Sequence, residues 1–152
     1  MSTPSKTLKE VEGTLQSVIE SLIDAQQGFL KIGEELNDET LKRYFLAESL
    51  TRAQYRGDLE TVLHQEGVHD IKKSGTANGT ILRAWGELKG KFGGSDHTLL
   101  ATAEEAEDAA KQAYDDALAR ELPFPVRQLL TTQSAHIHAS HDYVRDARDS
   151  RK

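Results

Sequence analysis

The stretch "LQSVIESLIDAQQGFLKIGEEL", residues 15–36, carries apolar side chains at alternating steps of three and four. Such spacing places them on one face of an α-helix, which has 3.6 residues per turn. Extended toward the N-terminus, the same seam comprises Leu8, Val11, Leu15, Val18, Leu22, Ala25, Phe29, Ile32 and Leu36, and is widened by Ile19, Ile23 and Leu30. It predicts a helix over residues 7–36, opened by a capping box at Thr7–Glu10. A stripe this wide needs other helices to cover it.

Further periodic segments supply those helices, separated by turn signals such as Asn37–Asp38 and the prolines at 123 and 125. We expect long helices over residues 38–65, 96–122 and 125–148, a short helix over 80–92 that carries Trp85, and frayed ends at 1–6 and 149–152. No segment alternates with a period of two, so strands are not expected. The chain is predicted to be one all-α domain over residues 7–148, an antiparallel four-helix bundle.

The connection between the second and third long helices is the unusual part of this plan. It spans roughly thirty residues, where a bundle of simple up-down-up-down order needs only a few. The excess suits a crossover that carries the chain back along the bundle, with the short helix inside it. That connection predicts a ferritin-like topology, in which the second and third long helices run parallel.

Composition and charge narrow the possible partners and compartment. The 152 residues carry a net charge of −6, which argues against general binding to nucleic acid. We find neither a signal-peptide core nor an apolar run of membrane-spanning length, and no cysteine is present. We therefore expect a cytoplasmic protein without a membrane partner. The alanine-rich and acidic faces of the helix over 96–122 make a homo-oligomer plausible.

Two charged residues interrupt the apolar stripe of the second helix. Glu48 and Arg52 fall within about 60° of the stripe centre at Leu59 on a helical wheel. On the third helix, Glu107 lies at the flank of an alanine-rich stripe. If the crossover makes the two helices parallel, Glu107 lies level with Glu48 and Arg52, and the bundle contains a polar layer.

The segment "QSAHIHASHD", residues 133–142, holds three of the six histidines. On a wheel centred at Ile137, His141 and Gln133 lie about 40° to either side, inside the stripe. His136 and His138 fall about 100° away, on opposite boundaries, so they cannot face one ion from the same side. Only His141 and Gln133 are therefore expected to join the polar layer.

This layer allows two interpretations. In the first, Glu48 and Glu107 share the forked donors of Arg52, and His141 and Gln133 complete a buried network. In the second, Glu48, Glu107 and His141 bind iron, manganese or zinc. We favour the network, because Arg52 would repel a metal ion. No catalytic or cofactor-binding residue is assigned.

A di-iron centre needs more ligands than the chain provides. Such bundles use a glutamate from each of two helices and a Glu-x-x-His pair from each of the other two. Here the seam of the first helix has no carboxylate, Glu48 is followed three residues later by Thr51, and Gln133 precedes His136. The pattern therefore departs from that of the di-iron proteins.

Several stretches together resemble a known family, and they are "LIDAQQGFLKIGEEL", "ETLKRYFLAESLTRAQY", "SGTANGTILRAWGELK", "EEAEDAAKQAYDDAL" and "LLTTQSAHIHASHD". In this order they are similar to a bacterial family of four-helix-bundle proteins, a domain of unknown function within the ferritin-like superfamily. The likeness covers about residues 8–148 and is most specific over 74–89. It implies a ferritin-like bundle, often linked with stress conditions, and implies no reaction. We therefore expect a non-enzymatic bundle that acts through its surface or assembly, with a metal-binding ferritin-like protein as the alternative.

Overall fold

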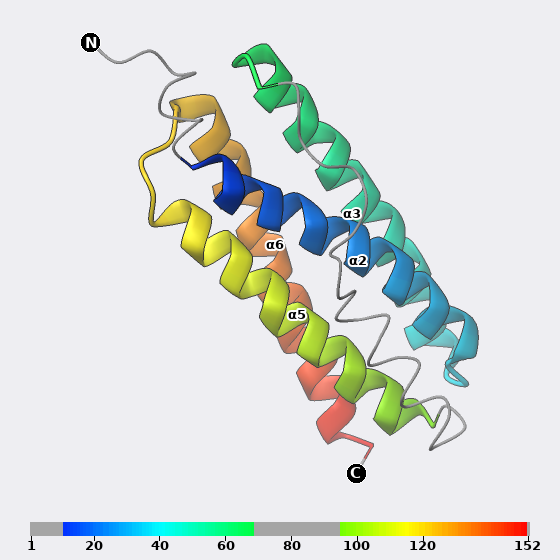
Figure 1. Ribbon diagram of the computed structural model, residues 1–152. Coiled ribbons are helices and arrows are strands. Elements are labelled where there is room, and N and C mark those ends of the chain that lie inside the picture. Colours follow the sequence, from blue (N-terminus) through cyan, green and yellow to red (C-terminus); the bar gives the residue numbers. More distant parts are fainter. Residues whose placement is uncertain (1–10, 69–94, 152) are drawn as a thin grey trace.

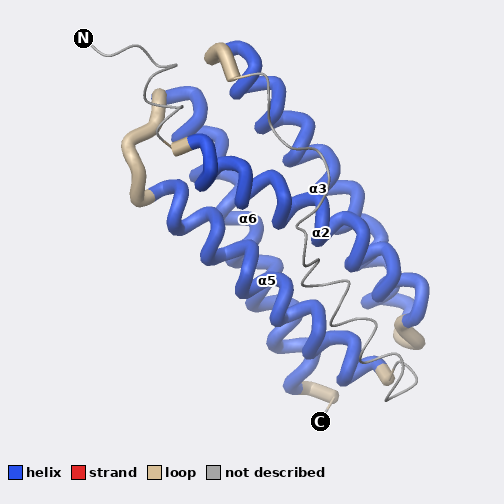
Figure 2. Tube along the Cα trace, viewed as in Figure 1, coloured by secondary structure: helices blue, strands red, loops and turns tan. Residues whose placement is uncertain are grey.

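The computed structural model describes residues 11–68 and 95–151, and these form four long α-helices (Figure 1). The helices are α2 (Glu12–Glu35), α3 (Glu39–Gln65), α5 (Asp96–Leu118) and α6 (Phe124–Asp149). Helices and short turns account for all of the described residues, and no strand occurs among them (Figure 2). The predicted all-α class and four-helix bundle are confirmed. Within the described residues, no helix is long and apolar enough to cross a membrane.

The order of the helices around the bundle follows from their contacts. α2 packs against α3 and α5, and α6 packs against the same two helices from the other side. α3 and α5 are therefore diagonal to each other. Figure 1 shows that α3 and α5 run in one direction and α2 and α6 in the other, so every neighbouring pair is antiparallel. The parallel arrangement on which the expected polar layer depends is present. The short helix predicted over 80–92, with Trp85, lies outside the described residues.

Most helix ends agree with the turn signals. Asp38 caps α3, because its side chain accepts a hydrogen bond from the Leu41 amide at 3.0 Å. Ser95 caps α5 through the Thr98 amide at 3.3 Å. Pro125 stands in the first turn of α6, as expected. The predicted capping box at Thr7–Glu10 and the frayed segment 1–6 lie outside the described residues.

Two predicted helix ends differ from the structure. α5 ends at Leu118, four residues before the predicted residue 122. The guanidinium of Arg127 donates to the Leu118 carbonyl at 3.1 Å and also to the Arg120 carbonyl, and these bonds satisfy carbonyls that a longer helix would use. At the other end of the chain, α6 continues to Asp149, and Arg151 pairs with Asp38 at 2.7 Å. The C-terminal segment is therefore held against the bundle over its described part.

The core consists of two apolar clusters. The larger lies where α2 and α6 begin, and includes Leu15, Ile19, Leu22, Leu59, Leu63, Tyr114, Leu130 and Ile137. The smaller lies where α3 and α5 begin, and includes Phe29, Ile32, Leu41, Phe45, Leu99, Ala103 and Val144. The seam predicted for the first helix is buried wherever it is described, but Leu30, expected to widen it, is 45% exposed. The wheel position of Leu30 lies at the edge of the stripe, which the helices of the described residues leave partly exposed.

The turn between α2 and α3 depends on a side chain from a third helix. Asp96 of α5 accepts the amides of Asn37 and Asp38 at 2.8 and 3.0 Å. We expect Asp96→Ala to lower the free energy of unfolding by about 1–2 kcal/mol, because both amides lose a charged acceptor. Urea denaturation measures this, and Glu105→Ala, an exposed change on the same helix, serves as the control. Equal stability of the two variants would contradict the prediction.

Candidate functional site

A charged layer separates the two apolar clusters, and we define it as Glu48, Arg52, Glu107 and His136. Glu48 and Arg52 lie one turn apart on α3, on the same face as Phe45 and Leu59, so the helical period directs them inward. Arg52 is the largest fully buried side chain in the described part of the protein. The inward position that the wheel predicts for both charges is confirmed.

Arg52 links three helices. Its Nε donates to Glu48 Oε2 at 2.8 Å, and its Nη2 lies 2.7 Å from Glu107 Oε1. Its guanidinium carbon lies 5.0 Å from the ring centroid of Phe29 on α2. Because α3 and α5 are diagonal, the pair with Glu107 crosses the centre of the bundle. The expected sharing of Arg52 between two glutamates is present in the structure.

Burial and charge act against each other in this layer. Burial raises the pKa of Glu107, and the positive charge of Arg52 only partly counteracts it. Burial alone would lower the pKa of Arg52, but the attraction of Glu107 and Glu48 outweighs that effect and raises it. Arg52 therefore remains charged in the folded protein. Removing such ions from water costs several kcal/mol each, which these pairs have to offset.

His136 completes the layer, although its wheel position had excluded it. Its Nε2 lies 2.9 Å from Glu48 Oε2 and 3.0 Å from Oε1, and its ring packs edge-on against Tyr55. The side chain is 40% exposed, so it connects the buried carboxylate to the surface. The exclusion was wrong because a boundary position on α6 faces the groove beside α3, and an imidazole can reach across it.

Gln133 is buried as predicted but makes different contacts. It accepts a hydrogen bond from the Tyr114 hydroxyl at 2.7 Å and donates to the Tyr55 carbonyl at 3.1 Å. A second tyrosine, Tyr44, donates to Ser140 at 2.6 Å. Burial raises the pKa of both Tyr44 and Tyr114, so their hydroxyls stay protonated. These hydrogen bonds lie next to the charged layer and provide partners for the buried polar side chains around it.

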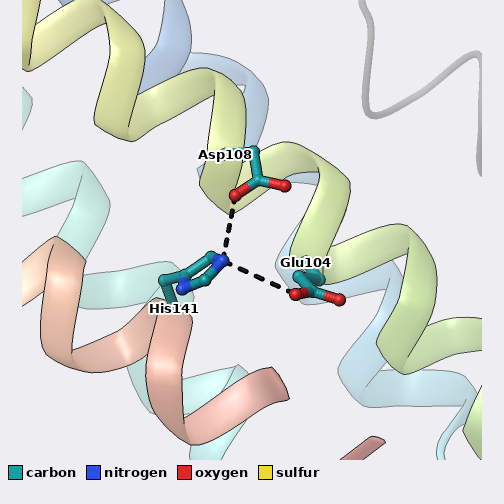
Figure 3. A group of neighbouring side chains, drawn as sticks. All are labelled: Glu104, Asp108 and His141. Atoms are coloured by element: carbon teal, nitrogen blue, oxygen red, sulfur yellow. Dashed lines mark ion pairs between the residues drawn. The ribbon is translucent and has the colours of Figure 1, made fainter.

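His141 does not join Glu48 and Glu107. It points toward Asp108 and Glu104 of α5 (Figure 3). Its Nε2 lies 2.9 Å from Asp108 Oδ1 and 3.6 Å from Glu104 Oε2. The expected height along the bundle was correct, since these carboxylates flank Glu107 on α5. The expected direction was wrong, because α6 turns His141 toward the face of α5 that carries Glu104 and Asp108. The predicted set of Glu48, Glu107 and His141 is therefore divided between two places.

The charged layer does not fit a di-iron centre. It offers two carboxylates and one imidazole, and the guanidinium of Arg52 lies within 2.8 Å of both carboxylates. A metal ion there would face this cation directly. α2 does bury one carboxylate, Asp24, which the seam positions did not include. The Glu-x-x-His pairs that a di-iron centre needs are absent from α3 and α6.

Comparison with known proteins identifies the family of the chain but assigns it no activity. No curated protein matches the chain. Residues 10–120 match the model of a family described as a domain of unknown function, DUF2383. This range contains α2, α3 and α5, and with them every residue of the charged layer except His136. The match covers well over half of the chain, which therefore belongs to the DUF2383 family.

Proposed function

We propose that the protein is a non-enzymatic, ferritin-like bundle that acts through its surface or through assembly, and that its charged layer is a structural device. Fully buried Arg52, held by carboxylates from two diagonal helices, carries this proposal. In a metal-binding bundle the space between such carboxylates holds the ion. Here the protein's own guanidinium supplies the positive charge.

The geometry explains what such a layer would do. Each wrong register or pairing of the helices would leave a buried charge without its partner, which costs several kcal/mol. Because the guanidinium lies 2.7 Å from Glu107 on the diagonal helix, this ion pair is suited to define the height at which α3 and α5 align. The layer would thus select one arrangement of four similar amphipathic helices.

The ferritin-like part of the proposal is supported by topology. α3 and α5 run parallel at diagonal positions, so α3 ends at one end of the bundle and α5 begins at the other. The family resemblance adds a bacterial source and a role under stress conditions to the proposal. Neither depends on the charged layer.

Metal binding within the layer is the second candidate function. It is favoured by one observation, the position of His136 beside Glu48, which adds an imidazole to two carboxylates from α3 and α5. Iron, manganese and zinc all accept such ligands. Binding would require Arg52 to leave both glutamates, so we rank this function below the first.

Iron oxidation distinguishes the two candidates. We expect the tag-free protein to oxidise Fe²⁺ in air no faster than a Glu107→Gln variant does, because Arg52 lies between the two carboxylates that would bind the iron. The absorbance of ferric products measures the rate, and circular dichroism checks that the variant is folded. Faster oxidation by the wild type, lost in both Glu107→Gln and His136→Ala, would establish the layer as a metal centre and overturn our first proposal.

A further inference from the structure

A second group of ligand-type side chains lies in the groove between α5 and α6. Glu104 and Asp108, one turn apart on α5, face His141 of α6, and one ligand atom from each lies within 4.8 Å of the others (Figure 3). We propose that Glu104, Asp108 and His141 bind a divalent transition-metal ion such as Zn²⁺. This groove site is separate from the charged layer and does not depend on the proposed function.

The contacts made by the two ring nitrogens of His141 are the first argument. Its Nδ1 lies 3.1 Å from Asp142 Oδ1, and a carboxylate there requires Nδ1 to be the N–H donor. In a neutral ring, Nε2 then presents a lone pair to the oxygens of Asp108 and Glu104. These three atoms all carry lone pairs, so they repel one another unless a cation lies between them. A metal ion between the three atoms removes this repulsion and forms a bond to each of them.

Burial strengthens this argument. His141 is only 7% exposed, so its ring cannot turn Nε2 into bulk water without leaving the groove. Asp142 holds the ring in place from the other side, as carboxylates do for metal-bound histidines. Arg148 pairs with Oε1 of Glu104 and leaves Oε2 toward His141. The imidazole is therefore oriented before any ion binds.

The two distances from His141 to the carboxylates are close to those of a zinc site. Zinc binds nitrogen and oxygen at about 2.0–2.2 Å in a tetrahedron, which places its ligand atoms about 3.4 Å apart. The separations of 2.9 Å from His141 Nε2 to Asp108 and 3.6 Å to Glu104 lie on either side of this value. The Asp108 side chain is 61% exposed, so it can adjust and water can take a fourth position.

The ligand set also indicates which ion the groove site prefers. One imidazole and two carboxylates suit Zn²⁺ and, with lower affinity in the usual order of divalent metals, Fe²⁺ and Mn²⁺. Mg²⁺ and Ca²⁺ prefer all-oxygen sites with more ligands. We therefore take Zn²⁺ as the probe.

Calorimetric titration of the tag-free, metal-stripped chain with ZnCl₂ tests the proposal. We expect one equivalent to bind to the wild type, with at least tenfold weaker binding to Asp108→Asn and no binding to His141→Ala. The matched control is His138→Ala, since His138 lies on the same helix and pairs with Asp115 of α5 at 3.5 Å, outside the groove site. Its affinity should equal that of the wild type.

Each result has a defined meaning. Asp108 is exposed, so Asp108→Asn keeps the test valid even if His141→Ala fails to fold. Absence of zinc binding to the wild type, or equal binding to wild type and Asp108→Asn, overturns the groove site and leaves the proposed function intact. Loss of binding in Glu107→Gln with no change in Asp108→Asn overturns both, because the ion would then lie in the charged layer. Loss in Asp108→Asn alone supports the groove site and leaves the charged layer structural.

Discussion

Replacement of Arg52 by methionine is expected to lower the free energy of unfolding by about 3–5 kcal/mol at neutral pH. Methionine approximates the volume of the side chain, so the loss arises from charge rather than from a cavity. Glu48 and Glu107 are both buried and would lose the cation that lies within 2.8 Å of each. Urea denaturation followed by circular dichroism measures the change.

The matched control is Arg56→Met. Arg56 lies one turn further along α3, where it is partly exposed and reaches Glu60 only at 3.9 Å. Partly exposed pairs of this kind contribute at most about 1 kcal/mol. Similar losses in the two variants would show that the buried position of Arg52 has no special role.

The pH dependence of the Arg52→Met variant provides a second check on the same prediction. Burial raises the pKa of Glu107 in the folded protein, and removal of Arg52 takes away a charge that lowers it. A carboxyl group whose pKa is higher in the folded state favours folding while it is protonated, and this contribution is lost as pH rises through the folded pKa. The deficit of the variant should therefore shrink as the pH is lowered toward about 4, near the ordinary glutamate pKa. A deficit that is independent of pH would contradict a stranded carboxylate.

Simultaneous replacement of the three buried charges, Glu48, Arg52 and Glu107, is expected to reverse that loss. The triple variant Glu48→Leu, Arg52→Met, Glu107→Leu should be at least as stable as the wild type, and thus several kcal/mol more stable than Arg52→Met alone. Apolar residues of similar volume avoid the desolvation cost that the buried ions have to offset. His136 loses its contact with Glu48, but its exposed edge can bind water instead. Urea denaturation under the same conditions compares the three proteins.

We expect the triple variant to keep its stability but to lose the single, well-defined arrangement of its helices. If the charged layer selects the register of α3 and α5, its removal should broaden or multiply the backbone amide signals in a ¹H–¹⁵N spectrum. The wild type should give one sharp set. A triple variant that is stable and equally well ordered would show that the apolar clusters alone define the arrangement. A triple variant as unstable as Arg52→Met would show that the ions contribute net stability.

The helices and their inward faces could be predicted from the sequence because both depend on local spacing. The seam from Val11 to Leu36 is buried throughout. The helical wheel correctly placed Glu48 and Arg52 on the face of α3 that points into the core. The length of the connection between α3 and α5 indicated that these helices run parallel. That direction brought Glu107 level with Arg52 and allowed their pairing to be expected.

Which residues His136 and His141 contact depends on the tertiary structure and could not be predicted from the sequence. His136 and His141 lie on opposite sides of α6, so one meets Glu48 of α3 and the other meets Asp108 of α5. A helical wheel gives the direction of each side chain but not the rotation of the neighbouring helix or the width of the groove between them. The end of α5 depended likewise on Arg127, which reaches it from α6. Periodicity is a property of one helix, whereas contacts across a groove depend on how two helices are placed, and only packing determines that placement.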